Sequence, residues 1–178
     1  MSARDNILRA YEEILIAGGE RAATLDAVAA KAGVSKGGLL YHFRSKEALA
    51  NGLFERLDAL ADADLATMAT APEGASVYYV RTSASQGSEF DRCLVAAARL
   101  GSGASSAIAA IQRRWLDLIT AEVGDDAVAK AILLLGDGIY YNAAVGPDAG
   151  GTPAAPQTAE EMEALVEVVA RLAGRSRR

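Results

Sequence analysis

Cysteine, proline and aromatic residues are scarce in this chain. Its 178 residues include one cysteine, four prolines and one tryptophan, and aromatic side chains make up 6% of the total. A lone cysteine, Cys93, cannot form a disulfide within the chain, which fits a reducing compartment such as the cytoplasm. No apolar run reaches the roughly 18 residues of a membrane span, and the polar N-terminus lacks a signal-peptide pattern. We therefore expect a cytoplasmic protein that makes no use of a membrane.

Groups that build catalytic or metal centres are also rare. His42 is the only histidine, and one histidine with one cysteine cannot supply a typical set of metal ligands. No nucleophile–base pair and no phosphate-binding loop occurs. The sequence therefore predicts neither an enzyme nor a bound metal or cofactor.

Positive charge is in deficit overall, but its distribution is uneven. The net charge of −5 by itself argues against nucleic-acid binding, which depends largely on neutralising phosphates. Residues 1–56, however, carry eight basic and seven acidic side chains, and no carboxylate lies between Ala27 and Lys46. A local basic surface on an acidic protein is typical of a DNA-binding module joined to a domain that does not bind DNA.

The apolar periodicity predicts helices throughout, because alanine is abundant and no long alternating run indicates a sheet. About nine helices are expected, with breaks at glycine and proline. Their predicted ranges are 3–17, 24–32, 35–43, 45–69, 76–85, 89–100, 105–123, 125–145 and 159–173. The predicted fold is all-α, with a three-helix N-terminal domain and a C-terminal helical bundle.

Two short helices separated by a tight turn form a helix-turn-helix pattern at residues 24–43. Thr24 and Ser35 are good N-cap residues, and Gly33 suits the turn between the two helices. The second helix opens with Gly37 and Gly38, each of which costs about 1 kcal/mol relative to alanine inside a helix. Glycines at this place let a backbone come close to DNA, which favours a recognition helix over a purely structural three-helix unit.

The side chains around this helix supply hydrogen-bond donors for DNA. Lys36 can reach guanine O6 and N7 or a phosphate, and Tyr41, His42 and Lys46 can donate to phosphate oxygens. Lys46 also precedes a helix whose free backbone amides favour an anion. For His42 the alternative is an ordinary core or surface residue.

Residues 24–49, TLDAVAAKAGVSKGGLLYHFRSKEAL, closely resemble the signature of TetR-family regulators, and the match covers about the first 56 residues. The resemblance implies a homodimer, usually a repressor, that a small molecule in the C-terminal domain releases from a near-palindromic double-stranded DNA operator. It implies base contacts from Lys36 and Gly37. It implies phosphate contacts from a further six residues: Thr24, Ser35, Gly38, Tyr41, His42 and Lys46. One departure is Leu40, which stands where many members carry tyrosine and could pack inward with Phe43.

The resemblance divides the chain into a DNA-binding domain, residues 1–56, and a ligand-binding and dimerisation domain, residues 57–178. It favours pairing of helices 125–145 and 159–173 with their copies in a second subunit, whereas burial within one subunit is the alternative. The effector is not identified by the sequence.

Several aromatic residues of the C-terminal part could line an effector pocket or belong to the core. The candidate pocket residues are Tyr78, Phe90, Trp115, Asp137, Tyr140 and Tyr141, with Tyr79 as a further aromatic candidate. Asp137 lies in an apolar helix and needs a partner if it is buried. It could cap a neighbouring helix, pair with Arg99 or Arg114, or bind the ligand.

The sequence is also compatible with a second function. The protein could be a small-molecule-binding helical protein whose DNA-binding module is degenerate. The acidic total and Leu40 are the features that support this alternative.

Overall fold

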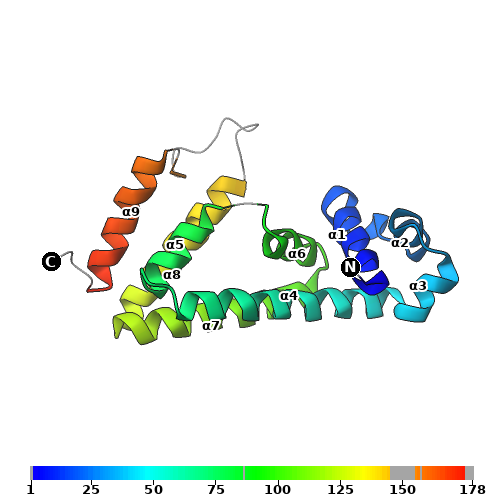
Figure 1. Ribbon diagram of the computed structural model, residues 1–178, viewed down its shortest axis with the longest axis horizontal. Helices are drawn as coiled ribbons and strands as arrows, with labels where there is room; N and C mark the ends of the chain where they lie inside the picture. The colour runs from blue at the N-terminus through cyan, green and yellow to red at the C-terminus, as the bar shows by residue number, and fades with distance from the viewer. Residues whose placement is uncertain (1, 86, 145–154, 157, 175–178) are drawn as a thin grey trace. The chain divides into compact units, whose positions relative to one another are not determined.

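The computed structural model describes residues 2–85, 87–144, 155–156 and 158–174. Within these ranges the regular secondary structure is nine α-helices with no strand, which confirms the all-α prediction (Figure 1). The helices are α1 (Ala3–Ala22), α2 (Leu25–Ala32), α3 (Lys36–His42), α4 (Lys46–Ala69), α5 (Ala75–Ser83), α6 (Glu89–Ala98), α7 (Ser102–Val123), α8 (Asp126–Ala144) and α9 (Ala159–Leu172). The predicted end of the eighth helix at Val145 lies outside the described residues.

The chain forms two compact units. One comprises Met1–Asp62 and Gly87–Ala110, and the other comprises Ala63–Gln86 and Ile111–Arg178. The first unit therefore contains α1, α2, α3, most of α4, and α6, while α5, α8 and α9 belong to the second unit. No helix in the described part of the chain is long and apolar enough to cross a membrane.

Helix α1 forms the centre of the first unit. Ser2 and Asp5 close a capping box at its start, with reciprocal contacts of 3.0 and 3.1 Å. The sequence predicts an end at Gly18-Gly19, and the backbone does leave helical geometry there, although a short helical stretch follows as far as Ala22. Gly19 adopts a left-handed φ of 68°, which kinks the helix, and helical structure continues to Ala22. Glycine can absorb this single non-helical residue because it has no Cβ.

The predicted helix-turn-helix forms as expected from its local signals. Thr24 and Ser35 cap α2 and α3, and Gly33 ends α2 in the left-handed region at φ 67°. The Asn6 amide donates to the Ala32 carbonyl at 2.8 Å, which satisfies a free carbonyl at the C-terminal end of α2 and ties it to α1. The turn geometry thus fixes α3 with its first residues exposed at the surface of the unit.

The second unit is built around α5, which contacts both α8 and α9. A buried glycine of α8, Gly136, faces the Tyr79 ring, and a Cβ there would lie 2.8 Å from Tyr79 Cδ1 and 2.9 Å from Ser83 Oγ. The helices can therefore approach closely only because this position has no side chain. This contact places Tyr79 beside Asp137, the next residue of α8.

Candidate nucleic-acid interface

The eight predicted DNA contacts lie on α2, α3 and the start of α4, or directly before them, all within the first unit. Six of them are exposed, namely Thr24, Ser35, Lys36, Gly37, Tyr41 and His42, and two are half-buried, Gly38 and Lys46. Tyr41 is 85% exposed, and its ring meets that of His42 edge-on at 5.1 Å.

The two glycines of α3 differ in their surroundings. A Cβ at Gly38 would lie 3.3 Å from the capping Ser35 hydroxyl, so this glycine leaves room for the cap. A Cβ at Gly37 would meet nothing closer than the same oxygen at 4.0 Å, and Gly37 is exposed. Packing within the chain therefore does not require a glycine at position 37. A glycine nevertheless stands there, and it weakens the helix relative to alanine.

The hydroxyls of Thr24 and Ser35 are engaged as helix caps. Thr24 Oγ1 accepts from the Ala27 amide at 3.1 Å, and Ser35 Oγ accepts from the Gly38 amide at 3.0 Å. In each contact the hydroxyl acts as the acceptor, so its own hydrogen stays available for a phosphate oxygen. Both caps can therefore hold the helices and still donate to DNA.

Three lysines of the first unit are paired with carboxylates. Lys36 Nζ lies 2.9 and 3.1 Å from the two carboxylate oxygens of Asp26. Lys46 Nζ donates to the Glu20 carbonyl at 2.7 Å and lies 3.6 Å from the Glu20 carboxylate. The third pair, Lys31 with Glu13, has a separation of 2.8 Å. The basic side chains predicted to meet DNA are thus partly neutralised from within the chain.

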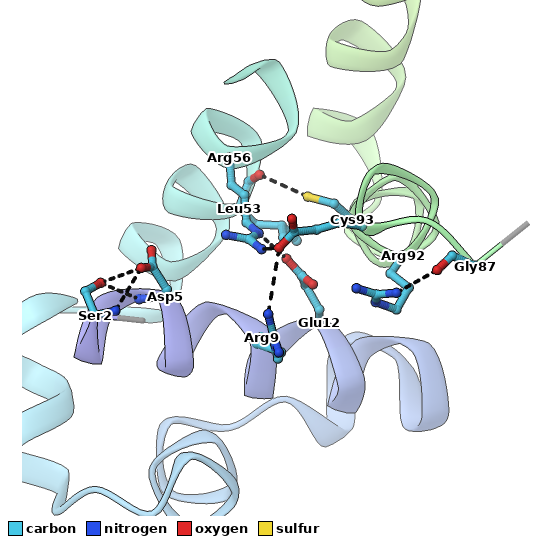
Figure 2. Close-up of polar contacts among 10 residues, drawn as sticks. Ser2, Asp5, Arg9, Glu12, Leu53, Arg56, Gly87, Arg92 and Cys93 are labelled. Atoms are coloured by element: carbon cyan, nitrogen blue, oxygen red, sulfur yellow. Dashed lines mark hydrogen bonds and ion pairs between the residues drawn. The ribbon is translucent and has the colours of Figure 1, made fainter. Parts of the chain in front are cut away.

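An ionic cluster that is buried at Glu12 and exposed at Glu89 joins three helices of the same unit (Figure 2). Glu12 of α1 is only 3% exposed, and its carboxylate lies 2.9 Å from Arg56 Nε of α4 without hydrogen-bond alignment. The Arg56 guanidinium also pairs with Glu89 of α6, which lies 3.8 Å from Arg9. One arginine therefore links α1, α4 and α6.

Burial dominates the electrostatics of this cluster. It raises the pKa of the Glu12 carboxyl, and the positive charge of Arg56 opposes the shift. Burial also raises the pKa of the Cys93 thiol to about 12, and the Glu12 charge adds to it. The Cys93 thiol donates to the Leu53 carbonyl at 3.7 Å, so this cysteine stays a protonated core residue. Glu12 was not among the residues predicted from the sequence, although its spacing from Leu8 and Leu15 places it on the buried stripe of α1.

The raised pKa of Glu12 gives a pH-dependent stability. A carboxyl whose folded pKa lies above its unfolded value stabilises the fold when protonated, and this contribution is lost as pH rises through the folded pKa. We expect wild type to lose stability relative to Glu12→Gln as pH rises from about 4.5, since glutamine mimics the protonated form. Urea unfolding of both proteins between pH 4 and pH 7 measures this difference. A difference that is constant with pH would contradict the raised pKa.

The second unit contains a hydrogen-bonded polar and aromatic cluster. Asp64 accepts from the Tyr78 hydroxyl and from Trp115 Nε1, both at 3.0 Å. Asp137 accepts from the Tyr79 hydroxyl at 2.7 Å and from the Gln112 amide at 2.9 Å. The rings of Tyr79 and Trp115 lie 5.4 Å apart and connect the two carboxylates. Burial and then the Asp64 hydrogen bond raise the pKa of Tyr78 to about 12, and burial likewise raises the pKa of Tyr79.

The predicted pocket residues are not all brought together. Tyr78, Trp115 and Asp137 belong to this cluster, whereas Phe90 lies on α6 in the first unit. Tyr140 is half-buried on α8, and Tyr141 is 68% exposed. The partners of Asp137 are Tyr79 and Gln112, in place of the arginines and the helix cap considered from the sequence. An open hollow of about 420 Å³ elsewhere in this unit is lined by Leu65, Ala66, Arg114, Asp117 and Leu118.

Two family models match the chain. The model of bacterial regulatory proteins of the tetR family matches residues 7–53, which include α2 and α3. The model of the tetracyclin repressor-like C-terminal domain matches residues 73–167. No curated protein matches the chain at a significant level.

Solved structures share the fold at low sequence identity. A candidate transcriptional regulator, SCO7518 from Streptomyces coelicolor A3(2), is 19% identical with a TM-score of 0.66, over 96% of this chain and 98% of that chain. The fatty acid degradation regulator FadR from Bacillus halodurans is 15% identical with a TM-score of 0.55, over 97% and 99% of the two chains. At these identities the similarity concerns the fold alone.

Proposed function

The chain belongs to the TetR family of bacterial transcriptional regulators, and from this premise we propose that it is a repressor that a small molecule releases from its DNA operator. Residues 1–56 contact DNA, and residues 57–178 bind the effector and a second copy of the chain. The observation that carries the DNA-reading role is the exposed start of α3. There Gly37 weakens a helix without any packing reason, and Lys36 stands beside it.

Eight residues form the DNA contact set of this proposal. Lys36 and Gly37 approach base edges, because the N-terminal residues of a recognition helix enter the major groove. The remaining six contact phosphates: Thr24, Ser35, Gly38, Tyr41, His42 and Lys46. The free hydroxyl hydrogens of the two caps and the exposed Tyr41 side chain support this assignment.

The dimer forms through α8 and α9, each of which has an exposed apolar stripe. On α8 the stripe contains Leu134 and Tyr141, 69% and 68% exposed, with Gly138 between them. On α9 it contains Ala164, Val168 and Leu172. A Cβ at Gly138 would meet no atom within 4 Å, so the chain itself does not require this helical glycine. A glycine between two exposed apolar side chains suits close approach by a partner helix.

The effector contacts the polar and aromatic cluster of the second unit. Asp64 and Asp137 each accept two hydrogen bonds from neutral donors. A ligand that carries hydrogen-bond donors can replace one of these donors at a carboxylate. A ligand that favours one spacing of the two recognition helices lowers operator affinity by its differential affinity for the two states.

The decisive experiment for this function is selection of genomic fragments by the purified full chain, followed by footprinting at two salt concentrations. Protection of a near-palindrome, with affinity that falls as salt rises, supports a dimeric DNA reader. Weak retention without an enriched site would instead indicate a ligand-binding protein with a degenerate DNA module.

The substitution Gly37→Ala distinguishes an effect on DNA binding from an effect on protein stability. We expect Gly37→Ala to stabilise the protein by up to about 1 kcal/mol, because alanine favours the helix and the space around the Cβ is open. The same methyl group occupies the space in which the backbone approaches DNA, so we expect operator affinity to fall by about tenfold or more. Thermal unfolding and a mobility-shift titration measure the two effects. Unchanged operator affinity would remove Gly37 from the interface.

A further inference from the structure

The ion pair between Asp26 and Lys36 spans the helix-turn-helix itself. Asp26 lies in the first turn of α2, and Lys36 is the first residue of α3. The Lys36 ammonium lies 2.9 Å from one carboxylate oxygen of Asp26 and 3.1 Å from the other. Both side chains are exposed, so the pair stands on the surface that faces DNA in the proposed function.

This geometry changes what Lys36 can recognise. An ammonium has three donors, and contacts to two oxygens leave one N–H for a further acceptor. A neutral acceptor, such as guanine O6 or N7, can take that hydrogen while the pair remains intact. A phosphate is an anion and is repelled by the Asp26 carboxylate beside it.

We propose that Asp26 determines specificity by holding Lys36 as an oriented donor for a base edge and withholding it from phosphates of unrelated DNA. The proposal rests on the proposed DNA-reading function and adds a residue outside the predicted contact set. Lys31 and Lys46 have carboxylate partners as well, but these come from α1 and not from the helix-turn-helix.

The first test uses Asp26→Asn and a random-sequence duplex of about 30 base pairs over a range of salt concentrations. Release of Lys36 adds a phosphate contact, so the slope of log affinity against log salt steepens by about 0.9 for each recognition helix engaged. We expect random-duplex affinity at low salt to rise several-fold. On the operator fragment obtained by genomic selection, we expect the ratio of operator to random affinity to fall about tenfold.

Glu47→Gln is the matched control, because it removes one exposed carboxylate from the first turn of α4. Glu47 takes part in none of the ion pairs found among the described residues. We expect this variant to leave the salt slope unchanged. The double variant Asp26→Asn with Lys36→Ala shows whether Asp26 acts through Lys36, and we expect no steeper slope than in Lys36→Ala alone.

The outcomes separate this inference from the proposed function. The specificity role of Asp26 would be overturned if Asp26→Asn and Glu47→Gln changed the salt slope equally. It would also be overturned if Asp26→Asn still steepened that slope in the Lys36→Ala background. The random-duplex measurement decides this even where genomic selection yields no operator. Absence of an operator for the wild-type chain bears on the proposed function instead.

Discussion

We expect a Leu134→Glu variant to be monomeric and to lose operator binding. Leu134 and Tyr141 lie seven residues apart on one face of α8 and are both largely exposed. In a two-fold dimer each residue of the interface occurs twice, so the substitution buries one charge from each subunit. Loss of a buried leucine amounts to about 1.5–3 kcal/mol for each copy, and an unpaired buried charge adds several more.

Loss of the dimer removes DNA binding indirectly, because two recognition helices must engage two half-sites together. Sedimentation equilibrium and a mobility shift on the same protein preparation measure both consequences. Leu134→Met is the control, since it conserves volume and polarity, and we expect it to remain dimeric. A Leu134→Glu protein that stays dimeric would place the subunit contact on another face.

Gly136→Ala is expected to destabilise the second unit by about 1–3 kcal/mol, as overpacking does in a well-filled core. An alanine normally stabilises a helix by about 1 kcal/mol relative to glycine, so the sign is reversed here by the Tyr79 ring. That ring cannot easily move, because its hydroxyl donates to Asp137 at 2.7 Å and its centre lies 5.4 Å from that of the Trp115 ring. The expected change in melting temperature is about 2–4 °C for each kcal/mol.

The cause of this destabilisation can be isolated with Tyr79→Leu. In that background the ring is absent, so we expect Gly136→Ala to lower the free energy of unfolding by clearly less than it does in wild type. Thermal unfolding of the four proteins at one protomer concentration completes the cycle. The same loss in both backgrounds would mean that the alanine clashes with something other than Tyr79.

The local parts of the fold follow from short-range patterns. Thr24, Gly33 and Ser35 act through neighbours within a few residues, and the ends of α2 and α3 follow from them. The break at Gly19 also follows from a local signal, but the helical stretch that continues to Ala22 does not, because a glycine permits both an end and a bend. The predicted DNA contacts lie on or beside these same short helices, which is why their exposure could be anticipated.

The contacts between distant segments could not be read from the sequence. Glu12 and Arg56 are 44 positions apart, and Tyr79 and Asp137 are 58 positions apart. The apolar periodicity shows that Glu12 and Asp137 lie among buried residues, but it does not say which donor reaches them. The choice of Tyr79 and Gln112 over an arginine for Asp137 depends on how α5, α7 and α8 pack.

Two separate stretches of the chain form the first unit, Met1–Asp62 and Gly87–Ala110. Helix α6 packs against α1 and supplies Glu89 to the arginine that also pairs with the buried Glu12. During synthesis on the ribosome, the helix-turn-helix therefore emerges well before the segment that completes its core. Until about residue 110 has left the exit tunnel, α6 cannot pack against α1, and the side chains around Glu12 stay exposed to solvent on that side. The order of translation therefore sets the earliest moment at which this unit can complete its folding.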